Sequence, residues 1–430
     1  MVGEGAVRVM VYLSAEYPRW EPKAEADLRA AIEDGRLAES HYLDAKREPA
    51  TGKSANKEAA QDMAAFAVDG GTLIIGVGED KDQQTFYLAP QPLAGAAEKM
   101  ENLARHLVDP PLSVFTTYLP SEDQPGAGYL LVHVPPSPLA PHMVGGRYYG
   151  RAGTTKYSLS DPEVARLHLL RQGRDADVLA MIRAQIDRDP VPREHRHNAH
   201  LFLLAHPLTA RAQMLLDLVT GPGWTQRLEA LVDRGRTPEL NQLLTNVQFE
   251  PSLGWLHERV RRARGVALTT SNLEEGRVYR PESGDLEHEK VMELEVDEDG
   301  GLRLYCTRLS ETMNSRGEVF FDAGVVDHTR RFLALVQAAS EHAAYLGPWS
   351  LAVGVTGIKG LPAYRHGIAF GPGAHSRFDE DDYTATTTAS WADLTKNPGT
   401  TTNRLVGRLA RALGTDGNYD TLLSDSAATD

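Results

Sequence analysis

The sequence has a single cysteine and no long apolar run, and these two absences exclude several classes of protein. Cys306 alone cannot form a disulfide within the chain or supply a cluster of thiolate metal ligands. No segment approaches the roughly 20 consecutive apolar residues that a membrane-spanning helix requires. The first residues, MVGEGAVRVMVYL, lack the charged, apolar and cleavage regions of a signal peptide. We therefore expect a cytoplasmic protein that makes no contact with a membrane.

The sequence also lacks an excess of positive charge. It carries 45 lysines and arginines against 59 aspartates and glutamates, a formal net charge of -14. A protein that coats nucleic acid by bulk electrostatics needs the opposite balance. Any contact with nucleic acid must therefore be made by a local basic patch, and salt should weaken it.

The length of 430 residues is too great for one typical hydrophobic core, so we expect two domains. The pattern of helices and strands predicts an α+β fold, with a mixed sheet in the N-terminal domain and a second α/β or α+β domain after it. We place the domains at residues 1–173 and 174–415, the second without an assigned role. The composition of residues 416–430 predicts a disordered tail.

Local signals define the elements of the first domain. A helix is predicted over residues 24–32 and a strand over 40–46. A second helix, capped by Asn56, ends at the glycines 70 and 71, and the apolar run 72–77 reads as a buried strand. Gly145 and Gly146 predict a tight turn, and a capping box at Ser160 begins a closing helix that runs to about residue 172.

The second domain begins with helical patterns, which dominate from residue 178 to about 264. Strands are predicted over residues 291–296, 302–309 and 319–326, with a hairpin turn at 297–301 between the first two. A helix over 329–345 and a strand over 350–355 follow.

Four segments of the first domain carry a family resemblance. They are residues 39–46 (ESHYLDAK), 66–67 (FA), 70–77 (GGTLIIGV) and 149–156 (YGRAGTTK). Together, in order and spacing, they resemble the Schlafen-type AlbA_2 family, whose pattern is E-S-x-x-x-E-F-K, a helix ending in F-A-N-x-x-G-G, a strand ending in I-G-V-D-D, and a later R-x-G-S/T. The resemblance covers residues 20–172. Asp44, Ala45 and Gly78 depart from the pattern.

The resemblance implies a function in nucleic-acid processing. Members of the family include endoribonucleases that cleave structured RNA such as tRNA with three acidic residues and a divalent metal. Residue by residue, the acidic positions fall on Glu39, Asp44 and Glu79. Asp80 and Asp82 are close enough to replace Glu79, which we prefer because it holds the second position after Val77.

The residue types make this trio chemically plausible on their own. Asp44 and Lys46 stand two apart on a predicted strand, so a carboxylate and a cation project from one face. Glu39 has the opposite parity, so it can join them only from a turn before the strand. Hard oxygen ligands of this kind select Mg²⁺ or Mn²⁺, which activates water at a phosphodiester. The competing interpretation is a set of ordinary solvated ion pairs.

Basic and aromatic residues would bind the nucleic acid. The segment 147–156 interleaves cations with tyrosines, a composition suited to phosphate contact and base stacking, although a solvated edge strand would look the same. The predicted contacts are Arg47, Lys53, Arg147, Tyr149, Arg151 and Lys156, with Lys46 and Arg151 orienting the phosphate at the catalytic residues.

The sequence leaves three functions open. The preferred one is a metal-dependent endoribonuclease. The second is a DNA- or RNA-binding module of a transcriptional regulator, in which the acidic residues are structural. The third is ATP binding, to which Gly52-Lys53-Ser54 gives little support because Arg47 replaces the first glycine of a phosphate-binding loop and no apolar strand leads straight into it. Vertebrate relatives join two such modules around RNA, so a homodimer would build the equivalent groove here.

Overall fold

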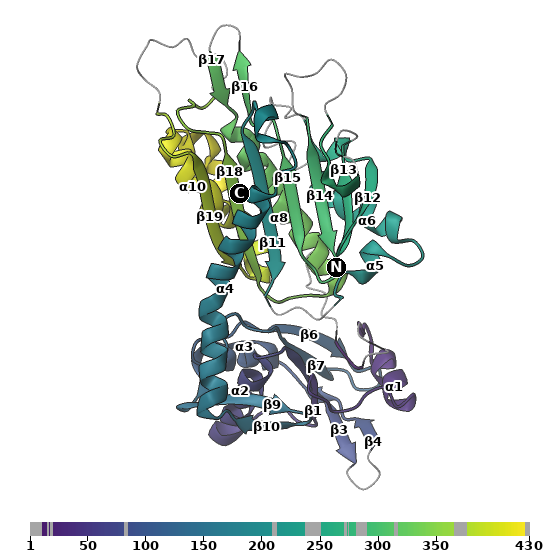
Figure 1. Cartoon of the computed structure of the whole chain (residues 1–430). Helices are drawn as coiled ribbons and strands as arrows, with labels where there is room; N and C mark the ends of the chain where they lie inside the picture. Colours follow the sequence, from purple (N-terminus) through teal and green to yellow (C-terminus); the bar gives the residue numbers. More distant parts are fainter. Residues whose placement is uncertain are drawn as a thin grey trace. The chain divides into compact units, whose positions relative to one another are not determined.

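The structure is a computed structural model of the 430-residue chain. It describes residues 11–425 except 15–16, 18–19, 81–84, 209–212, 237–250, 271–272, 274, 281–289, 314–316 and 365–375, and of 172–176, 193 and 275 it describes the backbone alone. The chain divides into two compact units: Met1–Gly173 with Ala344–Gly347, and Arg174–Ala343 with Pro348–Asp430 (Figure 1). Among the described residues, no helix is long and apolar enough to cross a membrane.

The first unit is built on a mixed five-stranded sheet, in the order β1-β2-β7-β5 with β6 also paired to β7. Only the β1–β2 pair is parallel, because helix α2 carries the chain back between these two strands. A three-stranded sheet (β8, β9, β10) and the hairpin β3–β4 complete the unit. The bounds are α1 Glu25–Glu33, β1 Leu43–Lys46, α2 Gly52–Phe66, β2 Gly71–Ile75, β3 Val77–Asp80, β4 Thr85–Leu88, β5 Gln91–Pro92, α3 Ala96–His106, β6 Phe115–Pro120, β7 Ala127–Val134, β8 Met143–Val144, β9 Arg147–Ala152 and β10 Thr155–Ser158.

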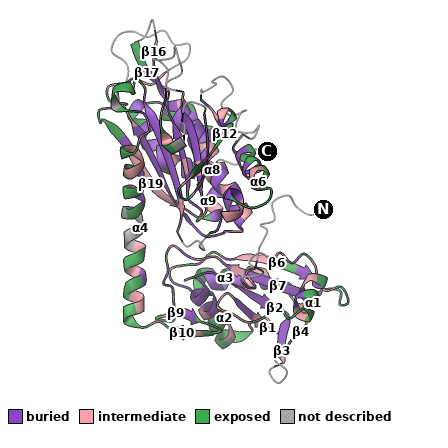
Figure 2. Cartoon of the chain, turned by 45° about the vertical axis from the view of Figure 1, so that its right-hand side comes forward, coloured by how far each residue is buried: buried purple, intermediate pink, exposed green. Residues whose placement is uncertain are grey.

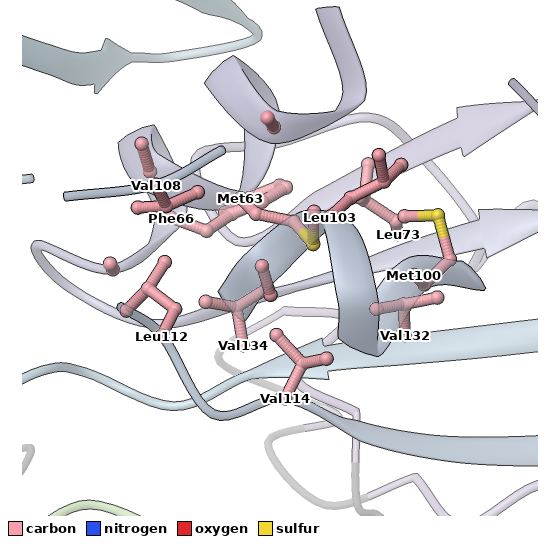
Figure 3. Close-up of a cluster of buried hydrophobic side chains, with 14 of the residues drawn as sticks. Met63, Phe66, Leu73, Met100, Leu103, Val108, Leu112, Val114, Val132 and Val134 are labelled. Atoms are coloured by element: carbon pink, nitrogen blue, oxygen red, sulfur yellow. The ribbon is translucent and has the colours of Figure 1, made fainter. Parts of the chain in front are cut away.

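Two apolar clusters cover the two faces of the mixed sheet. Helices α2 and α3 pack on one face through residues such as Met63, Phe66 and Met100 (Figure 3). Helix α1 packs on the other through Leu28, against Leu43 and neighbouring residues of the sheet. The strands of this sheet are coloured largely as buried in Figure 2. Residues of β1 that point away from the α1 side must therefore face α2.

The second unit contains a seven-stranded antiparallel sheet in the order β12-β13-β14-β15-β11-β18-β19. The second half of α4 packs on one face through Val178 and Ile182, and α8 and α10 lie along the other (Figure 1). The bounds are α4 Asp161–Asp187, η1 Arg193–His195, β11 His200–Pro207, α5 Leu216–Val219, α6 Trp224–Gly235, η2 Leu253–Trp255, β12 Glu258–Arg262, β13 Gly265–Thr269, η3 Glu275–Arg277, β14 Met292–Asp297, β15 Leu302–Cys306, β16 Ser310–Met313, β17 Gly317–Phe320, α8 Asp322–Ala343, β18 Trp349–Thr356, β19 Asp382–Ala389, α9 Trp391–Thr395, α10 Pro398–Leu413, η4 Asp416–Tyr419 and α11 Asp420–Leu423.

The α+β class is confirmed, and several predicted boundaries are corrected. The apolar run 72–77 is not one strand, because Gly76 turns the chain with φ +100° between β2 and β3. Helix α2 begins at Gly52, so Asn56 lies inside it, and α4 continues through Gly173 to Asp187. The region 178–264 holds strands β11 and β12 as well as helices, and Val325 and Val326 belong to α8.

The predicted disordered tail is also corrected up to residue 425. Residues Asp416–Leu423 form helical turns, and Tyr419, Leu422 and Leu423 are buried. The hydroxyl of Tyr419 donates to Asp322 Oδ2 at 2.9 Å. These three apolar side chains anchor the segment to the second unit, which the Ser-, Thr- and Asp-rich composition around them concealed. Residues 426–430 lie outside the described part.

Candidate functional site: a cluster of charged side chains on the α2 side of β1

Strand β1 places Asp44 and Lys46 on the side of the sheet that faces α2. Leu43 and Ala45 pack in the opposite cluster with α1, so the alternation of the strand turns the two charged residues the other way. Asp44 is only 4% exposed, and its Oδ2 atom lies 2.9 Å from Lys46 Nζ. The Lys46 side chain is 41% exposed, so its ammonium group reaches solvent beside a buried carboxylate.

Arg151 of β9 is the second cation beside Asp44. Its guanidinium group donates to Asp44 Oδ1 at 3.4 Å and to the carbonyl oxygens of Ser40 and Leu43 at 3.1 and 3.3 Å. It also lies over the Phe66 ring, 4.6 Å from the centroid. Arg151 is 7% exposed. The buried guanidinium group, with Nε and Nη2 donating to protein oxygens, therefore supports Asp44 and the loop before β1 instead of making the predicted phosphate contact.

Asp62 of α2 belongs to the same cluster and was missed from the sequence. It is 3% exposed, and Lys156 Nζ lies 2.7 Å from its Oδ1 atom. Its Oδ2 atom lies 3.9 Å from Lys46 Nζ. Burial raises the pKa of Asp62, and the two lysines act in the opposite direction. One signal was available: Asp62 lies four residues before Phe66, on the apolar face of the predicted helix, where an acid requires a partner.

Glu39 interacts electrostatically with Asp44 and with Glu79, which come from two other segments. Glu39 lies in the loop before β1, which is the placement that the strand parity required. Its pKa is raised by burial first, and then by the nearby carboxylates of Asp44 and Glu79. Glu79 is exposed on β3, just past the turn at Gly76. The turn requires glycine, because a Cβ at position 76 would lie only 2.9 Å from the Tyr129 ring. Acids from three segments therefore interact electrostatically.

The cluster meets some of the requirements of a cation site. Asp44 Oδ2 is buried and, among the described residues, has no partner with hydrogen-bond angles, although Lys46 stands at ion-pair distance. An unsatisfied carboxylate oxygen next to a second acid with a raised pKa is an arrangement that a divalent cation would stabilise. Within the described ranges, however, no three Asp, Glu, His or Cys side chains are already spaced as the ligands of one ion.

The residues predicted to bind nucleic acid divide into exposed and engaged groups. Arg47, Lys53 and Arg147 are exposed. Tyr149 is partly buried against the α2 cluster, and its hydroxyl accepts a hydrogen bond from Gln61 at 2.8 Å. Lys156 is held by Asp62. The alternative acid Asp80 lies next to Glu79 on β3, and Asp82 falls outside the described residues.

The segment Gly52-Lys53-Ser54 forms the first turn of α2. No apolar strand leads straight into it, as the sequence argument holds, since β1 (LDAK) ends at Lys46 and five residues connect it to the helix. Arg47 still occupies the position of the first glycine of a phosphate-binding loop.

Comparison with known proteins agrees with the motifs. Residues 39–160 match the family model described as Schlafen, AlbA_2. No curated protein matches the chain. Two solved structures are similar: the DIP2311 protein of Corynebacterium diphtheriae (17% identity, TM-score 0.20, covering 28% of this chain and 22% of that one), and the N-terminal domain of a protein of Nitrosomonas europaea described as related to the ATP-dependent DNA helicase RecG (20% identity, TM-score 0.23, 33% of this chain and 96% of that one). The chain thus spans less than a quarter of the first structure. The first unit carries a Schlafen AlbA_2 domain.

Proposed function

We propose that the first unit is a divalent-metal-dependent endoribonuclease acting on structured RNA such as tRNA. The observation that carries the proposal is the buried Asp44 carboxylate, one oxygen of which lacks a hydrogen bond among the described residues, beside Glu39. Burial and the carboxylates of Asp44 and Glu79 raise the pKa of Glu39, and a carboxyl group in such surroundings is characteristic of functional sites. The AlbA_2 domain supports a function connected with nucleic acid.

In this proposal Glu39, Asp44 and Glu79 hold Mg²⁺ or Mn²⁺. The bound ion would activate water and offset the charge that develops on a phosphodiester. Lys46 supplies the cation nearest to the acids, and its half-exposed ammonium group can contact a phosphate oxygen. The exposed Arg47, Lys53 and Arg147 would bind neighbouring phosphates, which gives an acidic chain the local basic patch that it needs.

A binding module without catalytic activity is the second candidate. Its support is that Asp44 already has two cations, Lys46 and Arg151, within 3.4 Å of its oxygens. A carboxylate paired in this way is a sound structural element with or without a metal. In this case the same exposed cations would bind DNA or RNA, and the acids would only support them.

One experiment separates the two candidates. The purified full chain is incubated with tRNA and with single- and double-stranded DNA, in Mn²⁺ or in EDTA. We expect Mn²⁺-dependent cleavage of RNA that falls by about 100-fold or more in Glu79→Gln, because a ligand of the metal is lost. Asp80→Asn makes the same charge change at the adjacent position of β3 and tests the alternative ligand: if Glu79 is the ligand, Asp80→Asn should cleave like wild type.

Three results would contradict the nuclease proposal or its details. If the wild-type protein binds RNA tightly but cleaves no more RNA in Mn²⁺ than in EDTA, the nuclease proposal is wrong and the binding module is the remaining candidate. Equal cleavage by Glu79→Gln and wild type would exclude Glu79 as a ligand. A thermal shift with ATP and none with RNA would favour nucleotide binding. Light scattering on the same sample tests whether two copies associate, as we propose for completing the RNA groove.

A further inference from the structure

Asp62 occupies an unusual place for an acid. It lies on the face of α2 that carries the buried residues Met63, Ala64 and Phe66, and its side chain is 4% exposed. A charge in such a place is costly unless cations and hydrogen bonds compensate it. The cations that compensate Asp62 are Lys156 and Lys46, and Lys46 also lies beside the proposed catalytic acid Asp44.

The surrounding geometry forms a closed ring of charges. Arg151 and Lys156 are direct cross-strand partners on β9 and β10, so their side chains leave the small sheet side by side. Arg151 pairs with Asp44, which pairs with Lys46; Lys46 lies 3.9 Å from Asp62, and Asp62 pairs with Lys156. The ring contains three cations and two acids. Only Lys46 has a side chain more than a third exposed.

We infer that Asp62 is a positioning residue that holds Lys46 and Lys156 where a phosphodiester is bound. Lys46 ends a flexible four-carbon side chain, and Asp44 alone would anchor it from one direction. Asp62 gives it a second anchor on α2, and by retaining Lys156 it prevents that cation from competing for Asp44. The catalytic part of this inference rests on the proposed nuclease function; the electrostatic part does not.

Asp62→Asn should change RNA binding and catalysis in opposite directions. Loss of one negative charge raises the net charge of the ring from +1 to +2, so RNA should bind several-fold more tightly in EDTA, with a salt dependence steeper by about one phosphate contact. In Mn²⁺, kcat should fall by roughly 10- to 100-fold because Lys46 is no longer held, as when outer supports of a site are removed. A merely structural role would instead lower the active fraction, with KM and Kd unchanged.

Glu58 provides the matched control. It lies one turn earlier on α2 and its carboxylate is 3.7 Å from the same Lys156 Nζ, but its side chain is 61% exposed. Glu58→Gln makes the same charge change outside the ring and should leave kcat, KM and RNA affinity as in wild type. Asp62→Glu restores the charge and should recover part of the kcat lost in Asp62→Asn. Failure of Asp62→Glu to exceed Asp62→Asn would overturn the inference.

The outcome remains decisive if the single variant does not fold or the enzyme hypothesis fails. Asp62→Asn/Lys156→Met removes both members of the buried pair, which proteins commonly tolerate, and its kcat should still fall because Lys46 has lost its second anchor. If the wild type cleaves nothing, anisotropy of labelled RNA at several salt concentrations still tests the charge argument. A folded Asp62→Asn protein with wild-type RNA affinity, salt dependence and kcat would refute the inference.

Discussion

Replacement of Arg151 by methionine is the most informative test of how the first unit holds its acids. The guanidinium group makes one hydrogen bond to Asp44 and two to the carbonyl oxygens of Ser40 and Leu43, over distances of 3.1 to 3.4 Å. Methionine has a similar length and can keep contact with the Phe66 ring, but it makes none of these bonds. The change therefore removes charge and hydrogen bonding while largely preserving volume.

The expected loss of stability follows from these contacts. Hydrogen bonds to a charged donor contribute about 1.5–3 kcal/mol each, and these long ones belong at the low end. Three of them give roughly 4–5 kcal/mol. The net loss in Arg151→Met is smaller than this sum, because the variant no longer has to desolvate a guanidinium group. Breaking one side of a buried ion pair costs about 3–5 kcal/mol in other proteins. We expect a loss in that range, which is a large fraction of the roughly 5–15 kcal/mol by which an ordinary domain is stable.

Hydrogen exchange on the full chain can measure this loss for one unit at a time. Amides of β1 and β2 should exchange roughly 100- to 5,000-fold faster in Arg151→Met, since each 1.4 kcal/mol is a factor of ten. Peptides from β14 and β15 in the second unit provide an internal reference. Arg147→Met, an exposed arginine on the same strand, should change the protection by less than about 0.5 kcal/mol.

A clear result would refute this reasoning. If the amides of β1 and β2 are as well protected from exchange in Arg151→Met as in Arg147→Met, the contacts of Arg151 contribute little to stability. A further check is the double variant with Asp44→Asn, which should be less destabilised than the sum of the two single changes because both remove the same pair.

Two further predictions concern other parts of the chain. The raised pKa of Glu39 means that its ionised form destabilises the fold, so Glu39→Gln should have a higher melting temperature than wild type at pH 7 to 8. This difference in melting temperature should shrink as the pH falls through the raised pKa and vanish below the ordinary pKa of 4.5. An equal difference at every pH would contradict this. Leu422→Ala should cost about 2–5 kcal/mol in urea denaturation because Leu422 is buried, whereas Thr421→Ala, at an exposed neighbour, should cost less than about 0.5 kcal/mol; equal effects would show that α11 does not anchor the tail.

Local signals predicted the elements of the first unit well, and failed where long-range packing decides. The stop of α2 near Gly70 and the turn at Gly145 and Gly146 follow from left-handed glycines, whose φ angles in the structure are +86°, +60° and +80°. The break at Gly76 was invisible because an apolar run continues through it. In the second unit, β11 is a continuous apolar run, and periodicity cannot distinguish such a strand from a buried helix.

The candidate site shows the same division. The placement of Glu39 in the loop before β1 could be anticipated from strand parity, whereas the convergence of Glu39, Asp44 and Glu79 on one ion stays a prediction. The burial of Arg151 could not be anticipated, because its partner Asp44 lies 107 residues away in the sequence. Asp62 was overlooked because a single acid in a helix is normally a solvated residue, although its place on the apolar face of the predicted helix was a signal; its partners, Lys46 and Lys156, become visible only in the fold.

The spacing of the ring residues along the chain has a consequence for synthesis. Asp44, Lys46 and Asp62 leave the ribosome early, whereas Arg151 and Lys156 lie on β9 and β10, the last two strands of the unit. Until these strands have been made, Lys46 is the one member of the ring that can compensate the two acids. A nascent chain therefore cannot complete the ring of charges before β10 has left the ribosome.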